Sequence, residues 1–274
     1  MAVSGIDVSK WQGRIDWQKV KNAGVGFALL RAGYGDALSY PAQIDETFEY
    51  NYSQCKKVSM PVGAYWYSYA TTEAMAVQEA KSCIAALKGK QFEYPIYYDV
   101  EEMRIFQTGR TNEIIKAFCD EMEKAGYWAG IYIFRSAVQT YLSQRTRSRY
   151  AMAIAEYGSK LNYSGQYGIW QNSSTWRVDG INGNVDHDWC YIDYPKQIKE
   201  RGKNGFPKPA DTSFRVEAKS ECDTFKGKES PPIAAHYKSG DRCTVEYTKD
   251  FYSQTWGKVK GADMWVRMSD FKRV

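Results

Sequence analysis

Residues 93–102 read Glu-Tyr-Pro-Ile-Tyr-Tyr-Asp-Val-Glu-Glu, a short apolar and aromatic run that ends in carboxylates. A strand buried in a parallel sheet should be apolar along nearly its whole length, so carboxylates at its end need a reason. Side chains alternate along a strand, which places Asp99 and Glu101 on one face and Glu102 on the other. The segment therefore predicts a buried parallel strand over residues 95–100, with two carboxylates on one face at its C-terminal end.

Seven further runs of this kind accompany it within residues 1–195, and amphipathic stretches separate the early ones. Apolar runs that alternate with amphipathic stretches are typical of strand and helix units around a parallel sheet. The last three runs are separated by intervals too short and polar for full helices. The sequence therefore predicts an α/β fold, an irregular closed barrel that loses its helices towards the end. The eight predicted strands cover residues 5–8, 26–31, 62–69, 95–100, 128–134, 150–155, 168–171 and 185–191.

Start and stop signals place three helices between the early strands. Asp16 and Thr72 are predicted N-caps, because a short polar side chain can accept a hydrogen bond from the first turn of a helix. Gly24 follows the last turn of the first helix, as expected for a helix C-terminus. The third helix carries apolar residues on one side and ends at Gly126.

The composition changes after residue 195. Residues 196–211 are rich in Pro, Gly and Lys and are predicted to form a linker. Residues 212–274 contain short runs broken by Gly and Asp turns, which predict a small all-β domain of about five strands. This tail shows no cluster of an acid, a base and a nucleophile. We therefore expect the tail to bind, and residues 1–195 to form a catalytic barrel.

Composition and charge exclude several classes of protein. Apolar residues make up 43% of the chain and charged residues 25%, as in an ordinary globular protein and not in a disordered or coiled-coil chain. The net charge of +5 is uneven, because residues 1–194 hold 20 basic and 21 acidic side chains while residues 195–210 hold 5 and 1. A protein that binds nucleic acid would be expected to carry its charge on the main fold, so no nucleic-acid partner is expected.

The histidines and cysteines narrow the chemistry further. Only His187 and His236 are present and no Cys-x-x-Cys occurs, which rules out the common zinc signatures. Two histidines also leave little scope for a Ser-His-Asp hydrolase. The six cysteines are sparse for a disulfide scaffold and are expected to be free, buried thiols, with a bond between Cys222 and Cys243 left open. No cofactor is expected.

The beginning of the chain bears on where the protein acts. The first residues lack a basic and then apolar signal segment, and no run reaches about 18 apolar residues. We therefore expect a protein made in the cytoplasm without a signal peptide and not inserted in a membrane. The oligomeric state is left open.

The carboxylates at the strand ends define a candidate catalytic site. Two carboxylates on one strand face raise each other's pKa, so that one can stay protonated as an acid while the other is ionised. Asp7 closes the first predicted strand and Asp186 belongs to the last, and these strands are neighbours in a closed barrel. We expect both to approach Asp99 and Glu101 at the mouth, where barrel enzymes hold their catalytic groups. Four carboxylates suit the cation-like transition state of glycosidic cleavage.

Other interpretations of these residues stay open. Taken alone, the pair Asp99 and Glu101 also fits a solvated loop after a strand. Clustered oxygen atoms suit a hard cation such as Ca²⁺ or Mg²⁺ as well, although no EF-hand spacing occurs. Residues in or just after the same strands are candidates for stacking on sugar faces or binding hydroxyl groups, with core packing as the competing explanation for each. These candidates are Trp11, Tyr34, Tyr65, Tyr67, Tyr157, Trp170 and Gln171.

Six blocks, in order between residues 5 and 188, resemble glycoside hydrolase family 25, the N-acetylmuramidase lysozymes. The resemblance implies an irregular (β/α)-barrel with five α/β units and three closing strands. It also implies hydrolysis of the β-1,4 bond between N-acetylmuramic acid and N-acetylglucosamine in bacterial peptidoglycan. The blocks are Asp7-Val-Ser-Lys-Trp-Gln-Gly, Arg31-Ala-Gly-Tyr-Gly, Val62-Gly-Ala-Tyr-Trp-Tyr-Ser-Tyr-Ala, Tyr98-Asp-Val-Glu101, Ile169-Trp-Gln and Val178-Asp-Gly-Ile-Asn-Gly-Asn-Val-Asp186.

Carried over by position, the resemblance implies that Glu101 is the general acid/base and that Asp99 is its partner carboxylate. In the family this partner is thought to assist the substrate's own 2-acetamido group, which attacks the anomeric carbon with overall retention. The spacing of the two residues does not separate this route from direct attack by Asp99. Asp7 and Asp186 match supporting acids. One departure is Ala153, where the family commonly has Trp, and this puts one substrate contact in doubt.

Residues 212–274 more weakly resemble a bacterial SH3-like cell-wall-binding module, through Trp256-Gly-Lys-Val and Met264-Trp-Val-Arg-Met. The two-part layout looks like a phage endolysin, which reaches the wall after holin-type release, with an exported bacterial autolysin as the alternative. Two other functions stay open. They are an endo-N-acetylglucosaminidase acting on the same polymer and a catalytically inactive wall-binding protein.

Overall fold

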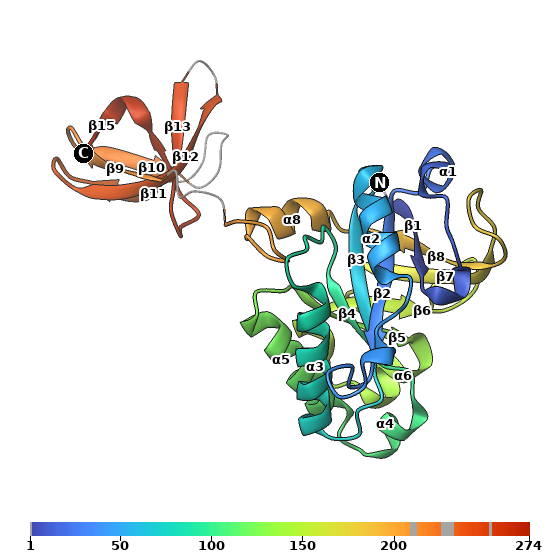
Figure 1. Cartoon of the computed structure of the whole chain (residues 1–274). Helices are drawn as coiled ribbons and strands as arrows, with labels where there is room; N and C mark the ends of the chain where they lie inside the picture. The colour runs from blue at the N-terminus through green and yellow to red at the C-terminus, as the bar shows by residue number, and fades with distance from the viewer. Residues whose placement is uncertain (1, 209–212, 226–232, 252–253) are drawn as a thin grey trace. The chain divides into compact units, whose positions relative to one another are not determined.

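A closed barrel of eight strands forms the larger part of the structure, a computed structural model that describes residues 2–208, 213–225, 233–251 and 254–274 (Figure 1). Neighbouring strands from β1 to β7 run parallel, and β8 is antiparallel to both β7 and β1. The strands are β1 (Val3–Val8), β2 (Phe27–Tyr34), β3 (Val62–Tyr67), β4 (Ile96–Asp99), β5 (Ala129–Phe134), β6 (Ala151–Ala155), β7 (Ile169–Trp176) and β8 (Val185–Cys190). The predicted closed α/β barrel is confirmed.

Helices follow each of the first five strands, whereas the fully described segments between β6, β7 and β8 contain none. This is the expected division into five α/β units and three closing strands. The Asp16 side chain caps α1 and the Thr72 side chain caps α3, as predicted. None of the described helices is long and apolar enough to cross a membrane. The helices of the barrel unit are α1 (Trp17–Asn22), α2 (Phe48–Lys57), α3 (Glu73–Leu87), α4 (Met103–Gln107), α5 (Thr111–Lys124), α6 (Arg135–Tyr141), α7 (Gln144–Arg149) and α8 (Tyr194–Glu200), with short 3₁₀ turns at Lys10–Gln12 and Pro41–Gln43.

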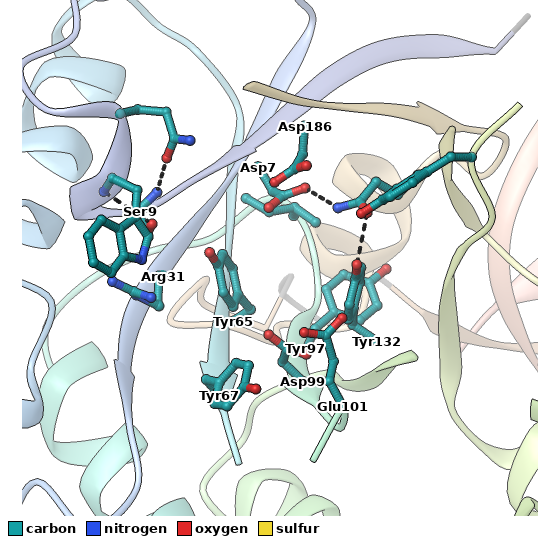
Figure 2. A pocket seen from close by; sticks show the side chains of 15 residues that line it. Asp7, Ser9, Arg31, Tyr65, Tyr67, Tyr97, Asp99, Glu101, Tyr132 and Asp186 are labelled. Carbon is teal, nitrogen blue, oxygen red and sulfur yellow. Dashed lines mark hydrogen bonds between the residues drawn. The ribbon is translucent and has the colours of Figure 1, made fainter. Parts of the chain in front are cut away.

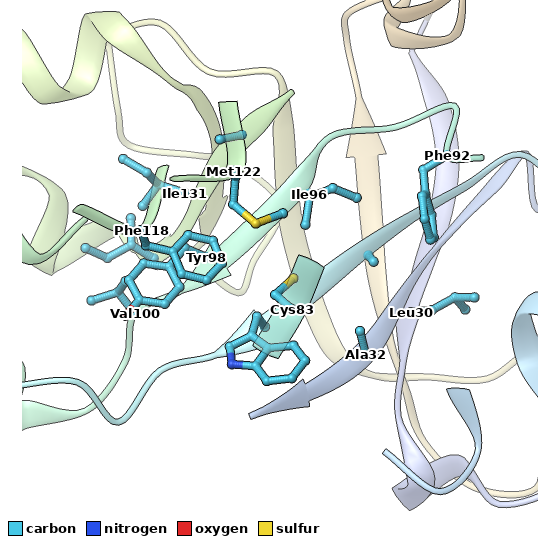
Figure 3. Packing of buried hydrophobic residues seen from close by; sticks show 14 of the residues in the cluster. Leu30, Ala32, Cys83, Phe92, Ile96, Tyr98, Val100, Phe118, Met122 and Ile131 are labelled. Atoms are coloured by element: carbon cyan, nitrogen blue, oxygen red, sulfur yellow. The ribbon is translucent and has the colours of Figure 1, made fainter. Parts of the chain in front are cut away.

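The two faces of β4 separate the barrel interior from the layer beneath the helices. Tyr98 belongs to the outer layer, where its ring stacks on Phe118 of α5 with ring centroids 3.8 Å apart (Figure 3). A stacked aromatic pair contributes about 0.5–1.5 kcal/mol beyond the burial of its area. Tyr97 instead belongs to a separate buried cluster with residues such as Phe27 of β2 and Ile169 of β7. The predicted alternation along β4 therefore turns Asp99 towards the inside of the barrel.

Glycines on neighbouring strands make room for the rings inside the barrel. A Cβ atom at Gly130 would lie 2.6 Å from the ring of Tyr97, and one at Gly5 would lie 2.2 Å from the ring of Phe27. Phe27 also stacks on Tyr94, with ring centroids 4.3 Å apart. These rings fill the interior on the side away from the strand C-termini, so only the opposite end stays open for polar side chains.

The linker predicted at residues 196–211 differs from the structure over most of its length. Most of α8 lies within it, and Asn204 beyond this helix is fully buried. The Asn204 side chain accepts a hydrogen bond from the backbone N–H of Trp128 at 2.6 Å. The first compact unit runs to Pro209. Composition alone gave a wrong prediction here for two reasons. Proline is compatible with the first turn of a helix, where Pro195 lies in α8. An amide such as that of Asn204 can be buried when it is hydrogen-bonded.

The second compact unit is an antiparallel β-sheet with the strand order β11-β10-β14-β13-β12-β9-β15. Its core contains Val216, Val245, Val266 and Phe271. A small all-β domain was predicted, but with fewer strands, because β14 and β15 are only three residues long. The strands are β9 (Phe214–Ala218), β10 (Cys222–Phe225), β11 (Ile233–Tyr237), β12 (Arg242–Phe251), β13 (Gln254–Val259), β14 (Trp265–Arg267) and β15 (Phe271–Arg273), with a 3₁₀ turn at Met268–Asp270.

Candidate active site

A pocket of about 230 Å³ opens at the end of the barrel where the parallel strands terminate. It brings together the four predicted carboxylates. Asp7 lies on β1, Asp99 ends β4, Glu101 follows β4 by two residues, and Asp186 lies on β8. Figure 2 shows Asp7 beside Asp186, with Asp99 and Glu101 facing them. The two strands that hold the first pair are hydrogen-bonded, and Asp7 and Asp186 are register partners across them. The lining residues are Asp7, Ser9, Trp11, Gln12, Leu29, Arg31, Tyr65, Tyr67, Tyr97, Asp99, Glu101, Tyr132, Tyr157, Gln171 and Asp186.

Five of the seven residues proposed to contact sugar line this pocket: Trp11, Tyr65, Tyr67, Tyr157 and Gln171. Trp11 and Tyr157 are 77% and 59% exposed, which places the two rings at the rim. Exposed aromatic rings of this kind can stack on a sugar face without first displacing a core contact.

Tyr34 and Trp170 do not line the pocket. The Tyr34 ring packs edge-on against Tyr69, with centroids 5.9 Å apart. Trp170 is mostly buried, and its indole N–H donates to the backbone oxygen of Glu156 at 2.8 Å. Because side chains alternate along β7, the inward position of Gln171 turns Trp170 outwards.

Six lining residues were not among the predicted ones. Arg31 stands two positions after Leu29 on β2, and Tyr132 is the register partner of Asp99 on β5. For the residues on β2, β4 and β5, the signal that would have found them is the alternation along each strand combined with the register around the barrel, and the register is not readable from local sequence. Ser9 and Gln12 instead belong to the 3₁₀ turn that follows β1. The residues are Ser9, Gln12, Leu29, Arg31, Tyr97 and Tyr132.

Arg31 is held by a buried ion pair at the side of the pocket. Its Nε atom donates to Asp45 Oδ2 at 2.7 Å, and Asp45 is almost fully buried. The positive charge of Arg31 opposes the rise in the pKa of Asp99. The guanidinium therefore favours the ionised form of that carboxyl group.

A chain of hydrogen bonds crosses the pocket from β5 to β1. The Tyr132 hydroxyl donates to Gln171 Oε1 at 2.8 Å, and Gln171 Nε2 donates to Asp7 Oδ2 at 2.7 Å (Figure 2). The chain fixes the orientation of the Gln171 amide between a hydroxyl group and a carboxyl group.

Burial is the main reason why the pKa of each of the four pocket carboxyl groups is raised. Asp186 raises the pKa of Glu101 further, and the Tyr132 hydroxyl opposes that rise. Glu101 likewise raises the pKa of Asp99. Carboxyl groups crowded in this way share protons, so that some stay protonated near neutral pH while others are ionised. The site can therefore supply an acid and an ionised carboxylate at the same time.

Neither histidine belongs to this pocket. His187 contacts Ser4 Oγ at 2.9 Å and Asn172 Oδ1 at 2.7 Å. His236 pairs with Asp223 in the second unit. Within the described parts of the chain, no group of three or more His, Cys, Asp or Glu side chains is arranged to hold a metal ion.

Residues 6–181 match the model of the family described as glycosyl hydrolases family 25. The uncharacterized protein YegX of Escherichia coli K12 is 28% identical over 196 residues, covering 67% of this chain and 68% of that protein. The autolytic lysozyme of Clostridium acetobutylicum is 27% identical over 187 residues, covering 68% and 55%.

A solved structure of the modular autolysin LytC from Streptococcus pneumoniae, in complex with a synthetic peptidoglycan ligand, is also similar. The two chains are 30% identical with a TM-score of 0.62, and the alignment covers 69% of this chain. The chain spans about half the length of that autolysin, since 47% of it is covered.

Proposed function

The chain belongs to glycosyl hydrolase family 25, and from this membership we propose that it is a lysozyme acting on peptidoglycan. The proposed reaction is cleavage of the β-1,4 bond between N-acetylmuramic acid and N-acetylglucosamine. The observation that carries this proposal is the pocket in which Asp99 and Glu101 face Asp7 and Asp186 and in which burial and crowding raise the pKa of Glu101. The similarity to an autolytic lysozyme and to an autolysin solved with a peptidoglycan ligand supports the same substrate.

Glu101 is the proposed general acid and base. Its raised pKa favours the protonated form that can give a proton to the glycosidic oxygen. As the bond between this oxygen and the anomeric carbon breaks, the proton stays on the departing sugar. In the second step a water molecule attacks the anomeric carbon, and Glu101 takes the proton that the water releases.

Asp99 is the proposed partner of the substrate's 2-acetamido group. The acetamido oxygen attacks the anomeric carbon as the leaving group departs, and the positive charge that develops on the amide is stabilised by an ionised carboxylate. Arg31 favours this ionised form. Water then opens the cyclic intermediate from the opposite side, which regenerates the acetamido group and gives net retention. Direct attack by Asp99 would also give retention.

Asp7 and Asp186 are proposed to support the site through their charge. They lie across the pocket from Asp99 and Glu101, where their charge can stabilise an oxocarbenium-like transition state. Trp11 and Tyr157 are proposed to stack on sugar rings at the rim.

Product analysis tests the bond that is cut. Purified cell walls are digested with the full-length protein, the fragments are reduced, and mass spectrometry identifies the sugar at each new reducing end. We expect muramic acid at these ends. Glucosamine at the new ends would instead show an endo-N-acetylglucosaminidase. The absence of new ends in a wall-binding sample would show a wall-binding protein without activity.

The second unit is proposed to be an SH3-like domain that anchors the enzyme to the wall, as in an endolysin released from the cytoplasm or in an exported autolysin. Its small sheet and its excess of basic over acidic residues, 12 against 10 in residues 211–274, suit an anionic wall. A chain truncated after Pro209 keeps the whole first compact unit, whereas a chain ending at Gly205 would lose Phe206, which packs against the buried cluster of Phe27 and Tyr97.

We expect the chain truncated after Pro209 to retain activity on soluble glycan fragments and to sediment less with intact walls than the full chain. Equal sedimentation of the two proteins would show that the second unit is not the anchor.

A further inference from the structure

Glu102, the acid that follows Glu101 in the chain, is hydrogen-bonded to a side chain of the pocket. The Tyr67 hydroxyl donates to Glu102 Oε1 at 3.0 Å, across 35 positions of the sequence. Tyr67 ends β3 and lines the pocket, whereas Glu102 stands just before the first turn of α4 and does not line it (Figure 2). Glu102 therefore makes its contact with the pocket through Tyr67.

Two neighbouring side chains hold this pair in place. Arg104 Nε lies 3.6 Å from Glu102 Oε2, and the Arg104 guanidinium lies 4.8 Å from the centre of the Tyr69 ring. The Tyr69 ring in turn packs edge-on against Tyr67, with centroids 5.2 Å apart. The two oxygen atoms of Glu102 thus face different partners, and this arrangement orients the carboxylate towards the Tyr67 hydroxyl.

The direction of this hydrogen bond follows from the two groups. Burial raises the pKa of the Tyr67 hydroxyl, and the hydrogen bond to Glu102 raises it further, so the hydroxyl keeps its proton at neutral pH. The Glu102 side chain is 31% exposed and faces the positive charge of Arg104. An ionised carboxylate has no proton to donate, so Tyr67 is the donor and Glu102 the acceptor.

The hydrogen bond decides what Tyr67 can offer to a ligand in the pocket. A tyrosine hydroxyl has one proton to donate, and its oxygen can also accept. Because the proton is directed to Glu102, the Tyr67 oxygen can only accept a hydrogen bond from the ligand. The groups of a glycan that suit such an acceptor are its hydroxyl groups and the N–H of an acetamido group.

We propose that Glu102 is a positioning residue, which takes up the Tyr67 hydrogen bond and so presents the Tyr67 oxygen to the pocket as an acceptor for a hydroxyl or acetamido N–H donor of the glycan. An acceptor of this kind serves the bound substrate and the transition state alike, so it acts on KM and not on kcat. The inference rests on the proposed function, but the hydrogen bond can be measured without it.

A double-mutant cycle on stability tests the hydrogen bond. Chemical denaturation compares the full-length wild type, Tyr67→Phe, Glu102→Leu and the double variant; the second unit is the same in all four proteins. We expect the effects of the two single changes on the unfolding equilibrium constant to overlap by about three- to tenfold in the double variant. Effects that simply multiply would overturn the proposal, whatever the enzyme's activity.

Kinetics on soluble glycan fragments test the positioning role. Glu102→Gln and Glu102→Leu both remove the charge, so any effect of that charge on Glu101 is common to the two variants and their kcat values should agree. Only Gln keeps an oxygen that can accept from Tyr67. We expect KM to rise about three- to tenfold in Glu102→Leu and in Tyr67→Phe, and to stay within about twofold of the wild type in Glu102→Gln. Glu113→Leu, at an exposed position on α5, is the matched control and should behave as the wild type.

Two kinetic outcomes would contradict the positioning role. Equal KM values in Glu102→Gln and Glu102→Leu would show that no acceptor is needed. A KM in the double variant well above that of Tyr67→Phe would show that Glu102 acts independently of Tyr67. If Glu102→Leu does not fold, as judged by circular dichroism, Glu102→Ala removes the same acceptor and takes its place. A wild type that releases no reducing ends would contradict the proposed function instead, and the stability cycle would still decide whether the hydrogen bond exists.

Discussion

Two kinds of buried carboxylate occur in the barrel unit, and they differ in their supply of hydrogen-bond donors. Asp45 has several hydrogen-bond donors. It accepts from the backbone N–H of Lys10 at 3.0 Å and from Arg31 Nε at 2.7 Å. It also accepts from the backbone N–H and the hydroxyl of Thr47, at 2.9 and 2.7 Å.

Glu79 of α3 also accepts hydrogen bonds from several donors. It accepts from the Ser68 hydroxyl at 3.0 Å, from the Tyr98 hydroxyl at 2.6 Å and from the backbone N–H of Tyr69 at 2.8 Å. All three donors oppose the rise in the pKa of Glu79 that burial causes, although its pKa stays raised. These donors tie the ends of β3 and β4 to the helix.

The pocket carboxyl groups have fewer donors and more like-charged neighbours. Asp99 Oδ1 has no hydrogen-bond partner among the described residues, and Asp7 receives a donor from Gln171. A carboxylate with several donors fixes structure, because removing it leaves those donors unpaired. A carboxyl group with few donors and acidic neighbours has a proton that it can give or take. From this difference we infer that Asp45 and Glu79 stabilise the fold, whereas the carboxyl groups of the pocket take part in the reaction.

Of the changes compared here, replacement of Asp99 should have the largest effect, and this effect should be on kcat. Replacing Asp99 by Asn removes the ionised partner of the acetamido group and should lower kcat by about a thousandfold, or about 4 kcal/mol of transition-state stabilisation. The melting temperature should not fall, because an ionised Asp99 is itself disfavoured by burial. Initial rates and thermal unfolding of the same sample check both parts. A loss of stability with little change in rate would reverse the assignment.

Asp45 should show the opposite pattern. Asp45→Ala leaves the Arg31 charge buried without its partner, which should lower the free energy of unfolding by about 3–5 kcal/mol. Chemical denaturation measures this difference. A variant as stable as the wild type would show that a buried carboxylate with several hydrogen-bond donors does not stabilise the fold.

Glu79 should show a smaller loss of stability that depends on the replacement. Glu79→Leu leaves the backbone N–H of Tyr69 without an acceptor and should cost about 1–3 kcal/mol. Glu79→Gln should cost less, because its oxygen can accept from Tyr69 while the two hydroxyl groups reorient towards its amide. Chemical denaturation of the two variants checks the order. Equal losses would mean that packing, and not hydrogen bonding, explains the role of Glu79.

The smallest expected effect, counted per pH unit, is the pH dependence of stability. A carboxyl group with a raised pKa keeps its proton in the folded state after the unfolded chain has lost it, so stability falls as pH rises between the two values. For Asp188, a buried residue on β8 whose pKa is raised mainly by burial, this window runs from its ordinary pKa of 3.8 to about 8. The slope is at most about 1.4 kcal/mol per pH unit for one group. Melting temperatures between pH 5 and 8 should therefore fall less steeply in Asp188→Asn than in the wild type or in Asp179→Asn, a control that changes an exposed aspartate. Parallel slopes in all three proteins would contradict the raised pKa.

The sequence predicted the strands and the four carboxylates because both leave a local signal. Asp99 and Glu101 interrupt an apolar run, and a closed barrel brings Asp7 and Asp186 together whatever the details of packing. Tyr34 and Trp170 were misplaced, and Arg31, Tyr132 and Asp188 were missed, because strand register decides which side chains share the interior. The sequence did not predict helix α8, because the Pro, Gly and Lys of residues 196–211 are also typical of linkers.

Release of reducing ends from purified walls by Glu101→Gln tests the central claim most directly. Glu113→Gln, the same change at an exposed position on α5, serves as the matched control. Gln cannot give up a proton to the glycosidic oxygen, so we expect Glu101→Gln to lose nearly all activity while its circular dichroism spectrum and melting temperature remain those of a folded protein. The control should match the wild type. Wild-type release of reducing ends by Glu101→Gln would contradict the assignment of Glu101 as the acid.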